Sequence, residues 1–122
     1  MTKIEDATNE QLDVAVAEKV MEWKWMAEAR VSSFWWDAAT EAIVDWQWSP
    51  STNIAHAFEV NKPGWRWKTW ELLYEWKPWL LVELYNEHGK MIAKAEVDSI
   101  DTAAHCRGRC LTALLACGVE EV

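Results

Sequence analysis

Two cysteines four residues apart, Cys106 and Cys110, have the spacing at which a helix could present two metal ligands on one side, next to His105. A structural zinc ion needs four ligands, usually from two paired clusters, and His56 and His88 lie in unrelated segments. A disulfide between the two cysteines is disfavoured, because Cβ atoms at this helical spacing lie roughly 5 to 6 Å apart and the bond needs about 3.8 Å. We therefore predict reduced thiols that behave as small apolar side chains, and no metal site.

Catalytic chemistry has no recognisable motif in this sequence. The four glycines are scattered, so no glycine-rich loop can hold a phosphate. Serine, histidine and aspartate are all present, but no Gly-x-Ser-x-Gly or comparable signature surrounds a serine. His56 is typical of a hydrogen-bonded structural residue, and Glu18 with Glu22 is typical of a solvated helix face. We therefore predict a protein that is not an enzyme, with no catalytic residues and no cofactor.

The segment Trp65-Arg66-Trp67-Lys68 alternates two indoles with two cations, which could form a stacking site for a planar ligand. The same pattern fits a sheet edge whose long basic side chains prevent pairing with another chain. We keep these four residues as an alternative ligand site beside that interpretation.

Eleven tryptophans in 122 residues are the most unusual feature of the composition. At roughly 200 Å² each they bring about 2,200 Å² of mostly apolar surface, about a third of what a folded chain of this mass exposes. Most of them must therefore be buried. Those that remain exposed are candidates for binding, because tryptophan is enriched at interface hot spots.

The first predicted helix, at about residues 9–24, carries the candidate partner-binding surface. Thr8 and Gln11 can form a capping box, and apolar residues recur at helical spacing as far as Trp23. On the opposite side of this predicted helix, a second line of apolar residues runs between acidic residues. The candidate residues are Glu10, Asp13, Val14, Glu18, Met21, Glu22 and Trp25. An alternative is that the helix ends near Glu22, so that Trp23 and Trp25 enter extended structure.

The net charge of −8 is unevenly distributed: residues 5–59 contain eleven acids and three bases, whereas residues 62–96 contain six bases and five acids. Direct binding to nucleic acid is disfavoured, because it needs clustered lysine and arginine. The longest aliphatic run, Leu80–Val82, is far shorter than the ~20 apolar residues that cross a bilayer. Residues 1–6 do not resemble a signal peptide, so we expect a cytoplasmic protein with no membrane partner.

The elements that must position these residues follow from apolar periodicity and from breakers. We predict a hairpin at about 33–48, a helix at about 50–61, strands at about 68–76, 79–86 and 90–97, and a helix at about 102–117, in a single domain of residues 1–122. Trp35 and Trp36 must point to opposite faces of a strand, and both are buried only if the sheet is covered on both sides. The predicted fold class is therefore α+β, an α/β/α sandwich with a central, mainly antiparallel sheet and helices on both faces.

Several details of these elements can also be predicted. Ser49 or Ser51 is expected to cap the helix at 50–61, and Lys77-Pro78 to form a strand-connecting turn. Asp101 or Thr102 should cap the last helix and Gly118 should end it. A stripe of small residues on that helix, which includes Cys106 and Cys110 but not Gly108, is expected to pack on the sheet.

The segment Pro50–Val60, with the sequence PSTNIAHAFEV, resembles the central motif of the phage ABA sandwich domain family, small proteins of tailed phages and prophages. Val16–Trp23 resembles the first helix of that family and Gly108–Gly118 resembles its last, in matching order and spacing. The resemblance implies an α/β/α layered fold and a phage origin. The family has no established activity or catalytic residues to carry over.

The sequence departs from the family pattern at Asn53, Glu22 and Leu111, where the family usually has Asp, Gly and Arg, and residues 65–79 have no clear counterpart. We expect a small non-enzymatic phage protein that acts by binding in the host cytoplasm, as an inhibitor or modulator of a host protein. An acidic surface would suit a host partner with a basic, nucleic-acid-binding surface, as an anti-defence (anti-CRISPR-like) factor requires. The alternatives are a small-ligand binding or sequestering protein with a Trp-lined pocket, and a virion-assembly or structural protein. The sequence does not determine the oligomeric state.

Overall fold

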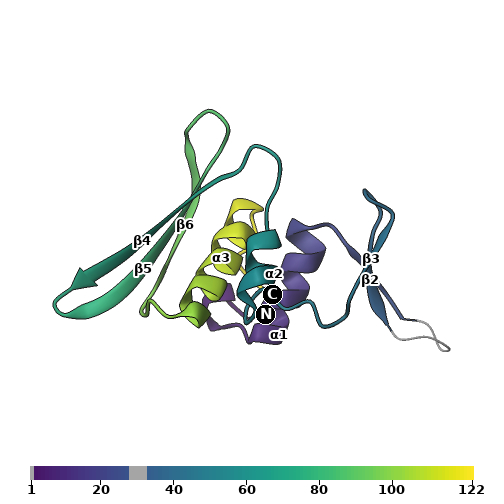
Figure 1. Ribbon diagram of the computed structural model, residues 1–122, viewed down its shortest axis with the longest axis horizontal. Coiled ribbons are helices and arrows are strands. Elements are labelled where there is room, and N and C mark those ends of the chain that lie inside the picture. The colour runs from purple at the N-terminus through teal and green to yellow at the C-terminus, as the bar shows by residue number, and fades with distance from the viewer. Residues whose placement is uncertain (1, 28–32) are drawn as a thin grey trace.

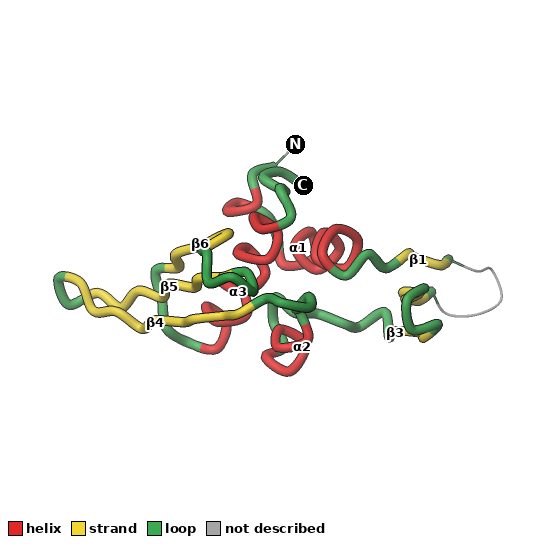
Figure 2. Tube along the Cα trace, turned by 90° about the horizontal axis from the view of Figure 1, so that it is seen from above, coloured by secondary structure: helices red, strands yellow, loops and turns green. Residues whose placement is uncertain are grey.

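The computed structural model describes residues 2–27 and 33–122. These residues form an elongated α+β molecule, with an antiparallel sheet at each end and the helices between the sheets (Figure 1). The elements in chain order are a 3-10 turn (Ile4–Asp6), α1 (Asn9–Ala15), a π-helical continuation of α1 called η2 (Val16–Val20), β1 (Lys24–Met26), β2 (Phe34–Asp37), β3 (Ala42–Val44), α2 (Ile54–Glu59), β4 (Arg66–Tyr74), β5 (Lys77–Tyr85), β6 (Met91–Val97) and α3 (Thr102–Ala116). Segments near the two termini lie side by side (Figure 2), where Lys3 and Glu121 form an antiparallel bridge.

The helix α3 is the element around which the others pack. One side of it lies on β5 and β6, and its other sides contact α1, η2 and α2. Asp101 caps α3 by accepting a hydrogen bond from the Ala104 N–H at 2.8 Å, and Gly118, with a φ of 77°, ends it. α3 therefore joins β5 and β6 to the other helices.

The side of α3 that packs on the sheet differs from the predicted one. A Cβ atom added to Gly108 would lie 2.8 Å from Val82 Cγ2, so the missing side chain lets the helix approach the sheet closely. Cys110 and Leu114, on another side, lie in the main core cluster with α1 and η2. Gly108 allows the closest approach to β5, so the side of α3 that carries it packs on the sheet. The predicted stripe lies on another side and packs mainly on helices.

The first helix is shorter than the predicted span of 9–24. Thr8 and Gln11 form the expected capping box, with N–H to side-chain oxygen distances of 2.9 and 3.2 Å. The helix, however, ends at Val20, and Glu22 has a left-handed φ of 58°. This correction agrees with the alternative in which the chain becomes extended after Glu22, and β1 begins at Lys24. Burial of the Trp23 indole offers a physical reason, because it packs edge-on against Trp48 at 4.5 Å between ring centroids.

The strands form two separate antiparallel sheets instead of a single central one. In the first sheet β1 pairs with β2 and β2 with β3, so that Trp25 lies opposite Trp35 and Trp35 lies opposite Val44. In the second sheet β4, β5 and β6 pair in order. The predicted hairpin at 33–48 is thus present as β2 and β3, but it gains β1 as a third strand. In both sheets each strand pairs with its neighbour in sequence, and the division falls between β3 and β4, where α2 interrupts the run of strands.

The two faces of the β4–β5–β6 sheet have different surroundings. On the face that packs on α3, Leu80, Val82 and Leu84 are buried. On the opposite face, Trp70 and Leu72 remain about half exposed. The mixed α+β class is confirmed, whereas the sandwich with helices on both faces of one sheet is not.

Two predicted helix and strand ends are shifted in the structure. The turn between β4 and β5 lies at Glu75 and Trp76, whose φ values of 49° and 65° fit a two-residue hairpin loop, and Lys77 is already part of β5. The helix α2 begins at Ile54 instead of near residue 50. Its cap is Asn53, whose side chain accepts hydrogen bonds from two backbone N–H groups at 3.0 and 3.2 Å.

The three cysteines are free thiols. Cys106 and Cys110 are buried, and burial raises the pKa of both, which keeps the thiols neutral at ordinary pH. Cys117 is partly exposed, and burial raises its pKa as well. Low thiolate content makes all three weak nucleophiles.

Candidate functional site

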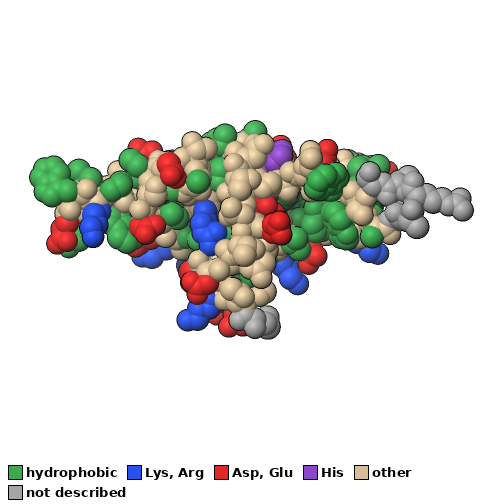
Figure 3. Space-filling model, turned by 90° about the horizontal axis from the view of Figure 1, so that it is seen from below, with side chains coloured by type: hydrophobic (Ala, Val, Ile, Leu, Met, Phe, Trp, Pro, Cys, Tyr) green, Lys and Arg blue, Asp and Glu red, His purple; other side chains and the backbone are tan. Residues whose placement is uncertain are grey.

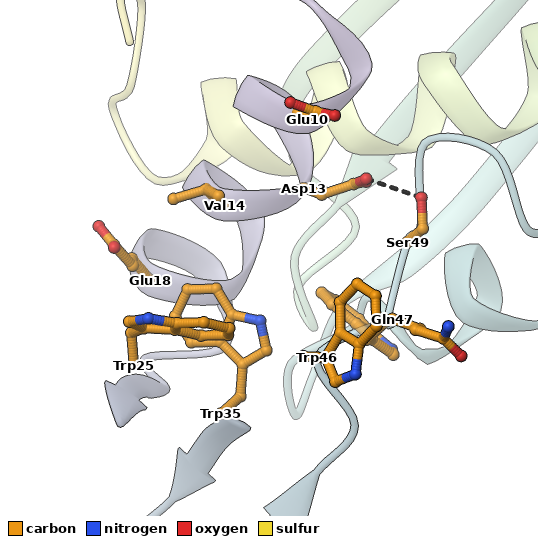
Figure 4. Close-up of a pocket in the computed structure, with 10 residues that line it drawn as sticks. Glu10, Asp13, Val14, Glu18, Trp25, Trp35, Trp46, Gln47 and Ser49 are labelled. Atoms are coloured by element: carbon orange, nitrogen blue, oxygen red, sulfur yellow. Dashed lines mark hydrogen bonds between the residues drawn. The ribbon is translucent and has the colours of Figure 1, made fainter. Parts of the chain in front are cut away.

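A hollow of about 640 Å³ lies between α1 with η2 on one side and the segments around β1, β2 and β3 on the other (Figure 4). We call it the tryptophan groove. Its lining residues are Glu10, Asp13, Val14, Glu18, Trp25, Trp35, Trp46, Gln47, Trp48 and Ser49. They come from parts of the chain that lie far apart in sequence, and the fold brings them together.

The aromatic walls of the groove are held in place by the first sheet and by the core. Trp25 and Trp35 are cross-strand partners whose rings meet edge to face at 5.0 Å, and Trp46, in the segment after β3, lies across the groove from them (Figure 4). Trp48 is 5% exposed, and its Nε1–H donates to Glu59 Oε2 at 3.0 Å. Trp25 and Trp46 keep 42% and 56% of their surface exposed. The groove therefore offers two accessible indoles on supports that are already packed.

Three carboxylates from α1 and η2 give the groove a negative potential. Asp13 accepts a hydrogen bond from Ser49 Oγ at 2.7 Å and another from the Ser51 N–H at 2.9 Å. It therefore ties the segment before α2 to α1. Glu10 and Glu18 are exposed, and neither forms a salt bridge within residues 2–27 and 33–122. Among the described residues that line the groove there is no lysine, arginine or histidine to neutralise these carboxylates.

Ser49, His56 and Asp13 lie near one another but are not arranged as a catalytic triad. Ser49 Oγ donates directly to Asp13 and lies 2.7 Å from Thr52 Oγ1. The imidazole instead accepts a hydrogen bond from the Ser49 N–H at its Nδ1, at 3.0 Å, and stacks on Trp48. A triad requires the imidazole to bind the nucleophile's own hydroxyl. This cluster is therefore arranged to fix a turn, which agrees with the structural role predicted for His56.

Five of the seven predicted partner-binding residues line the groove: Glu10, Asp13, Val14, Glu18 and Trp25. The other two lie elsewhere. Met21 packs against the main core cluster, and Glu22 lies 4.0 Å from Lys62 Nζ. The reason is the early end of the helix, which turns the chain at Glu22 and removes Met21 from the predicted apolar line.

The alternative ligand site at residues 65–68 is divided between two faces of β4. Trp65 and Trp67 lie together, with ring centroids 5.9 Å apart, and pack against the main core cluster. Alternation of the strand puts Arg66 and Lys68 on the opposite face, where Lys68 Nζ lies 4.9 Å from the Tyr85 ring centroid. The structure therefore does not bring the two indoles and the two cations into one site.

The cation that does stack on Trp67 is Arg109, from α3. Its guanidinium carbon lies 4.0 Å from the Trp67 ring centroid and 5.5 Å from that of Phe58. Nη2 donates to the Val60 carbonyl oxygen at 3.0 Å, and burial lowers the pKa of Arg109 to about 10. The side chain therefore stays charged at neutral pH and joins α3 to β4 and to the end of α2.

The opposite wall of the groove was not assigned from the sequence. Trp35, Trp46 and Trp48 lie far from α1 in the chain, so spacing in the sequence does not reveal their contact with it. The one available signal is weak: Trp46 directly follows Asp45, which indicates an exposed position. Only the tertiary contact identifies the groove.

No family model, curated protein or solved structure matches this chain. Within the part of the chain that the structure describes, no helix is long and apolar enough to span a bilayer. Those residues also contain no group of three or more His, Cys, Asp or Glu side chains placed to hold a metal ion. The groove is therefore the feature from which function must be argued.

Proposed function

We propose that this protein acts by binding another protein, and that the tryptophan groove is its contact surface. The observation that carries the proposal is the combination of three carboxylates and four tryptophans around one hollow of about 640 Å³, with no cation among the lining residues that the structure describes. Tryptophan is the residue type most enriched at binding hot spots, and charge of one sign speeds the encounter with a partner of opposite sign. Binding, rather than catalysis, is also supported by the arrangement of Ser49, His56 and Asp13.

The proposed partner is a host protein with a basic surface of the kind that binds nucleic acid, which this protein would inhibit or modulate as an anti-defence factor. The phage origin and the host cytoplasm rest on the resemblance of Pro50–Val60 and its flanking segments to the phage family, whereas the α/β/α sandwich also rests on Trp35 and Trp36, which must point to opposite faces of a strand. The sandwich would need a helical layer over the half-exposed face of β4–β5–β6, and an experimental structure of the protein with its partner would test it.

The direct test is capture of a partner from bacterial lysate, followed by kinetics with matched charge variants. Glu10→Lys with Glu18→Lys reverses two groove carboxylates that make no structural hydrogen bond among the described residues. Glu87→Lys with Asp98→Lys reverses two exposed acids near the second sheet and changes the net charge equally. We expect the groove pair to slow association strongly and to flatten its salt dependence, and the control pair to have little effect. Equal behaviour of the two folded variants would refute the proposal.

A small organic ligand is the second candidate. It is favoured by the two accessible indoles, Trp25 and Trp46, which lie on different sides of the hollow (Figure 4). The volume falls within the roughly 300 to 1,000 Å³ of ligand pockets. A protein partner would also cover surface around the groove, because stable interfaces bury about 800 Å² per partner. Charge reversal outside the hollow, for example at Glu22, should therefore weaken a protein partner but leave a small ligand unaffected.

A further inference from the structure

We propose that the tryptophan groove receives an arginine side chain of the partner, with the guanidinium held between the indoles of Trp46 and Trp25 and paired with the carboxylate of Glu18. This inference rests on the proposed function, since it names the chemical group that the groove recognises. The proposal depends on the charge of the groove, on the shape of its aromatic walls and on its rigidity.

The charge of the groove selects a cation. Among the described residues, every charged side chain that lines it is a carboxylate, and Asp13 is already engaged with Ser49 and Ser51. Glu10 and Glu18 are the other two, and both are exposed. An indole face also attracts cations, more strongly than the face of any other side chain. An anionic or neutral occupant would leave both kinds of attraction unused.

The aromatic walls favour a guanidinium over an ammonium ion. Trp46 and the Trp25–Trp35 pair lie on different sides of the hollow, which leaves a slot between indoles (Figure 4). A guanidinium is planar and weakly hydrated, so it can stack on an indole while its N–H groups point outward to carboxylates. An ammonium ion is compact and strongly hydrated, and its point charge gains less from a flat wall. Arginine therefore fits both the aromatic and the acidic part of the lining.

The same chain already contains this kind of contact. Arg109 stacks on Trp67 at 4.0 Å and approaches Phe58 at 5.5 Å, while Nη2 donates to a carbonyl oxygen. In the tryptophan groove the acceptor would be the carboxylate of Glu18, which forms stronger, charge-assisted hydrogen bonds.

The groove needs little rearrangement to receive such a group. Trp35 and Trp48 are each 5% exposed, and Trp48 is fixed by its hydrogen bond to Glu59. Asp13 fixes the segment that follows Trp46 and Trp48 through two hydrogen bonds. A preorganised site loses less conformational entropy on binding, so even a short peptide should report its preference.

The test uses three acetylated and amidated pentapeptides, Gly-Ser-X-Ser-Gly, in which X is arginine, lysine or citrulline. Citrulline keeps the shape of arginine but has no charge. Calorimetry and tryptophan fluorescence should show that the arginine peptide binds about tenfold more tightly than the citrulline peptide, and several-fold more tightly than the lysine peptide. Equal binding of arginine and citrulline peptides, or no binding of either, would overturn the inference. So would tighter binding of lysine.

Variants of the protein locate the site. Trp46→Ala and Glu18→Gln should each weaken the arginine peptide about tenfold. The matched controls Trp76→Ala and Glu87→Gln, at exposed positions outside the groove, should leave it unchanged. If the controls weaken binding as much as the groove variants, the peptide binds elsewhere and the inference is wrong.

The outcomes also separate the inference from the proposed function. If the Glu10 and Glu18 reversal abolishes partner binding while the citrulline peptide binds as well as the arginine peptide, the proposed function stands and the arginine assignment fails. If the arginine peptide binds in the groove but the reversal leaves the captured partner bound, the assignment stands and the proposed function fails.

Discussion

The tryptophan groove and the outer face of the β4–β5–β6 sheet are both rich in tryptophan, but their charges are arranged differently. On the outer face, Trp70 Nε1 donates to Glu83 Oε1 at 2.6 Å. Glu83 itself lies between Lys68 and Lys94 in the strand register. Glu83 therefore has two cations and a hydrogen-bond donor beside it. In the groove, Glu10 and Glu18 have no such neighbour among the lining residues that the structure describes.

The two regions also differ in shape. Hydrophobic side chains gather toward both ends of the elongated molecule (Figure 3), over the β4–β5 hairpin and over the β1–β2–β3 end. The groove forms a hollow of about 640 Å³, whereas the hollow beside Leu72 and Trp79 on the outer face has a volume of about 300 Å³. Tryptophan content alone therefore does not locate a binding site. The surrounding charges and the depth of the hollow distinguish the two regions.

The largest expected difference between the two regions is the stability lost when one tryptophan of each is replaced by alanine. Trp35 is 5% exposed, so Trp35→Ala should lower the free energy of unfolding by about 3 to 5 kcal/mol. Trp76, at the tip of the β4–β5 hairpin, is 90% exposed, so Trp76→Ala should change it by no more than about 0.5 kcal/mol. Chemical denaturation of the two variants would measure both values. Similar losses of unfolding free energy in the two variants would show that both tryptophans contribute equally to the core.

A smaller loss of stability is expected when a side chain is placed between α3 and the second sheet. Gly108→Val would place side-chain atoms where Val82 already lies, and overpacking of this kind costs about 1 to 3 kcal/mol. The control is Ala103→Val, at an exposed position of the same helix, where only helix propensity changes. Hydrogen exchange should show faster opening of β5 and β6 than of β2 in the Gly108 variant. Uniform acceleration throughout the chain would contradict the separate attachment of the two ends.

Substitutions in the turn between β4 and β5 should stabilise the protein. Glu75 and Trp76 both adopt left-handed backbone conformations, which cost L-residues other than glycine or asparagine about 1 kcal/mol or more each. The double change Glu75→Asn with Trp76→Gly should therefore raise the free energy of unfolding by about 1 kcal/mol without touching the groove. Thermal and urea unfolding would check the gain, and unchanged affinity for the arginine peptide would confirm that the two ends are independent.

Residues that obey local rules were predicted well from the sequence. The capping box at Thr8 and Gln11, the cap at Asp101 and the acidic residues of α1 all follow from spacing within one element. The division of residues 65–68 between two faces also follows from the two-residue period of a strand. That rule alone disfavours a site in which the two indoles and the two cations lie together.

The rest depended on contacts that the sequence does not encode locally. The end of the first helix is set at Glu22, whose left-handed conformation lets the Trp23 indole reach Trp48. The wall formed by Trp46 depends on which distant segments meet. The acidic residues of the groove and Trp25 could therefore be predicted, whereas Trp35, Trp46 and Trp48 could not.

The smallest expected effect concerns the turn between β2 and β3, which depends on a charge, unlike the turn at Glu75 and Trp76. Asp37 Oδ2 accepts from Thr40 Oγ1 at 2.8 Å and Oδ1 accepts from the Ala39 N–H at 3.1 Å. These hydrogen bonds, that of Thr40 above all, hold the pKa of Asp37 below its ordinary value of 3.8.

Because the folded state holds this carboxylate at the lower pKa, its contribution to stability is complete above about pH 4 and is lost as the pH falls through the folded pKa. Thr40→Val should move the pKa of Asp37 back toward 3.8, and carboxyl chemical shifts followed by NMR would record the change. Asp37→Asn should remove the corresponding acid-dependent loss of stability, whereas Asp45→Asn, in the next turn, should retain it. If the pKa of Asp37 does not rise in the Thr40 variant, the hydrogen bond from Thr40 does not stabilise the carboxylate. The β2–β3 turn would then depend on its backbone, as the turn at Glu75 and Trp76 does.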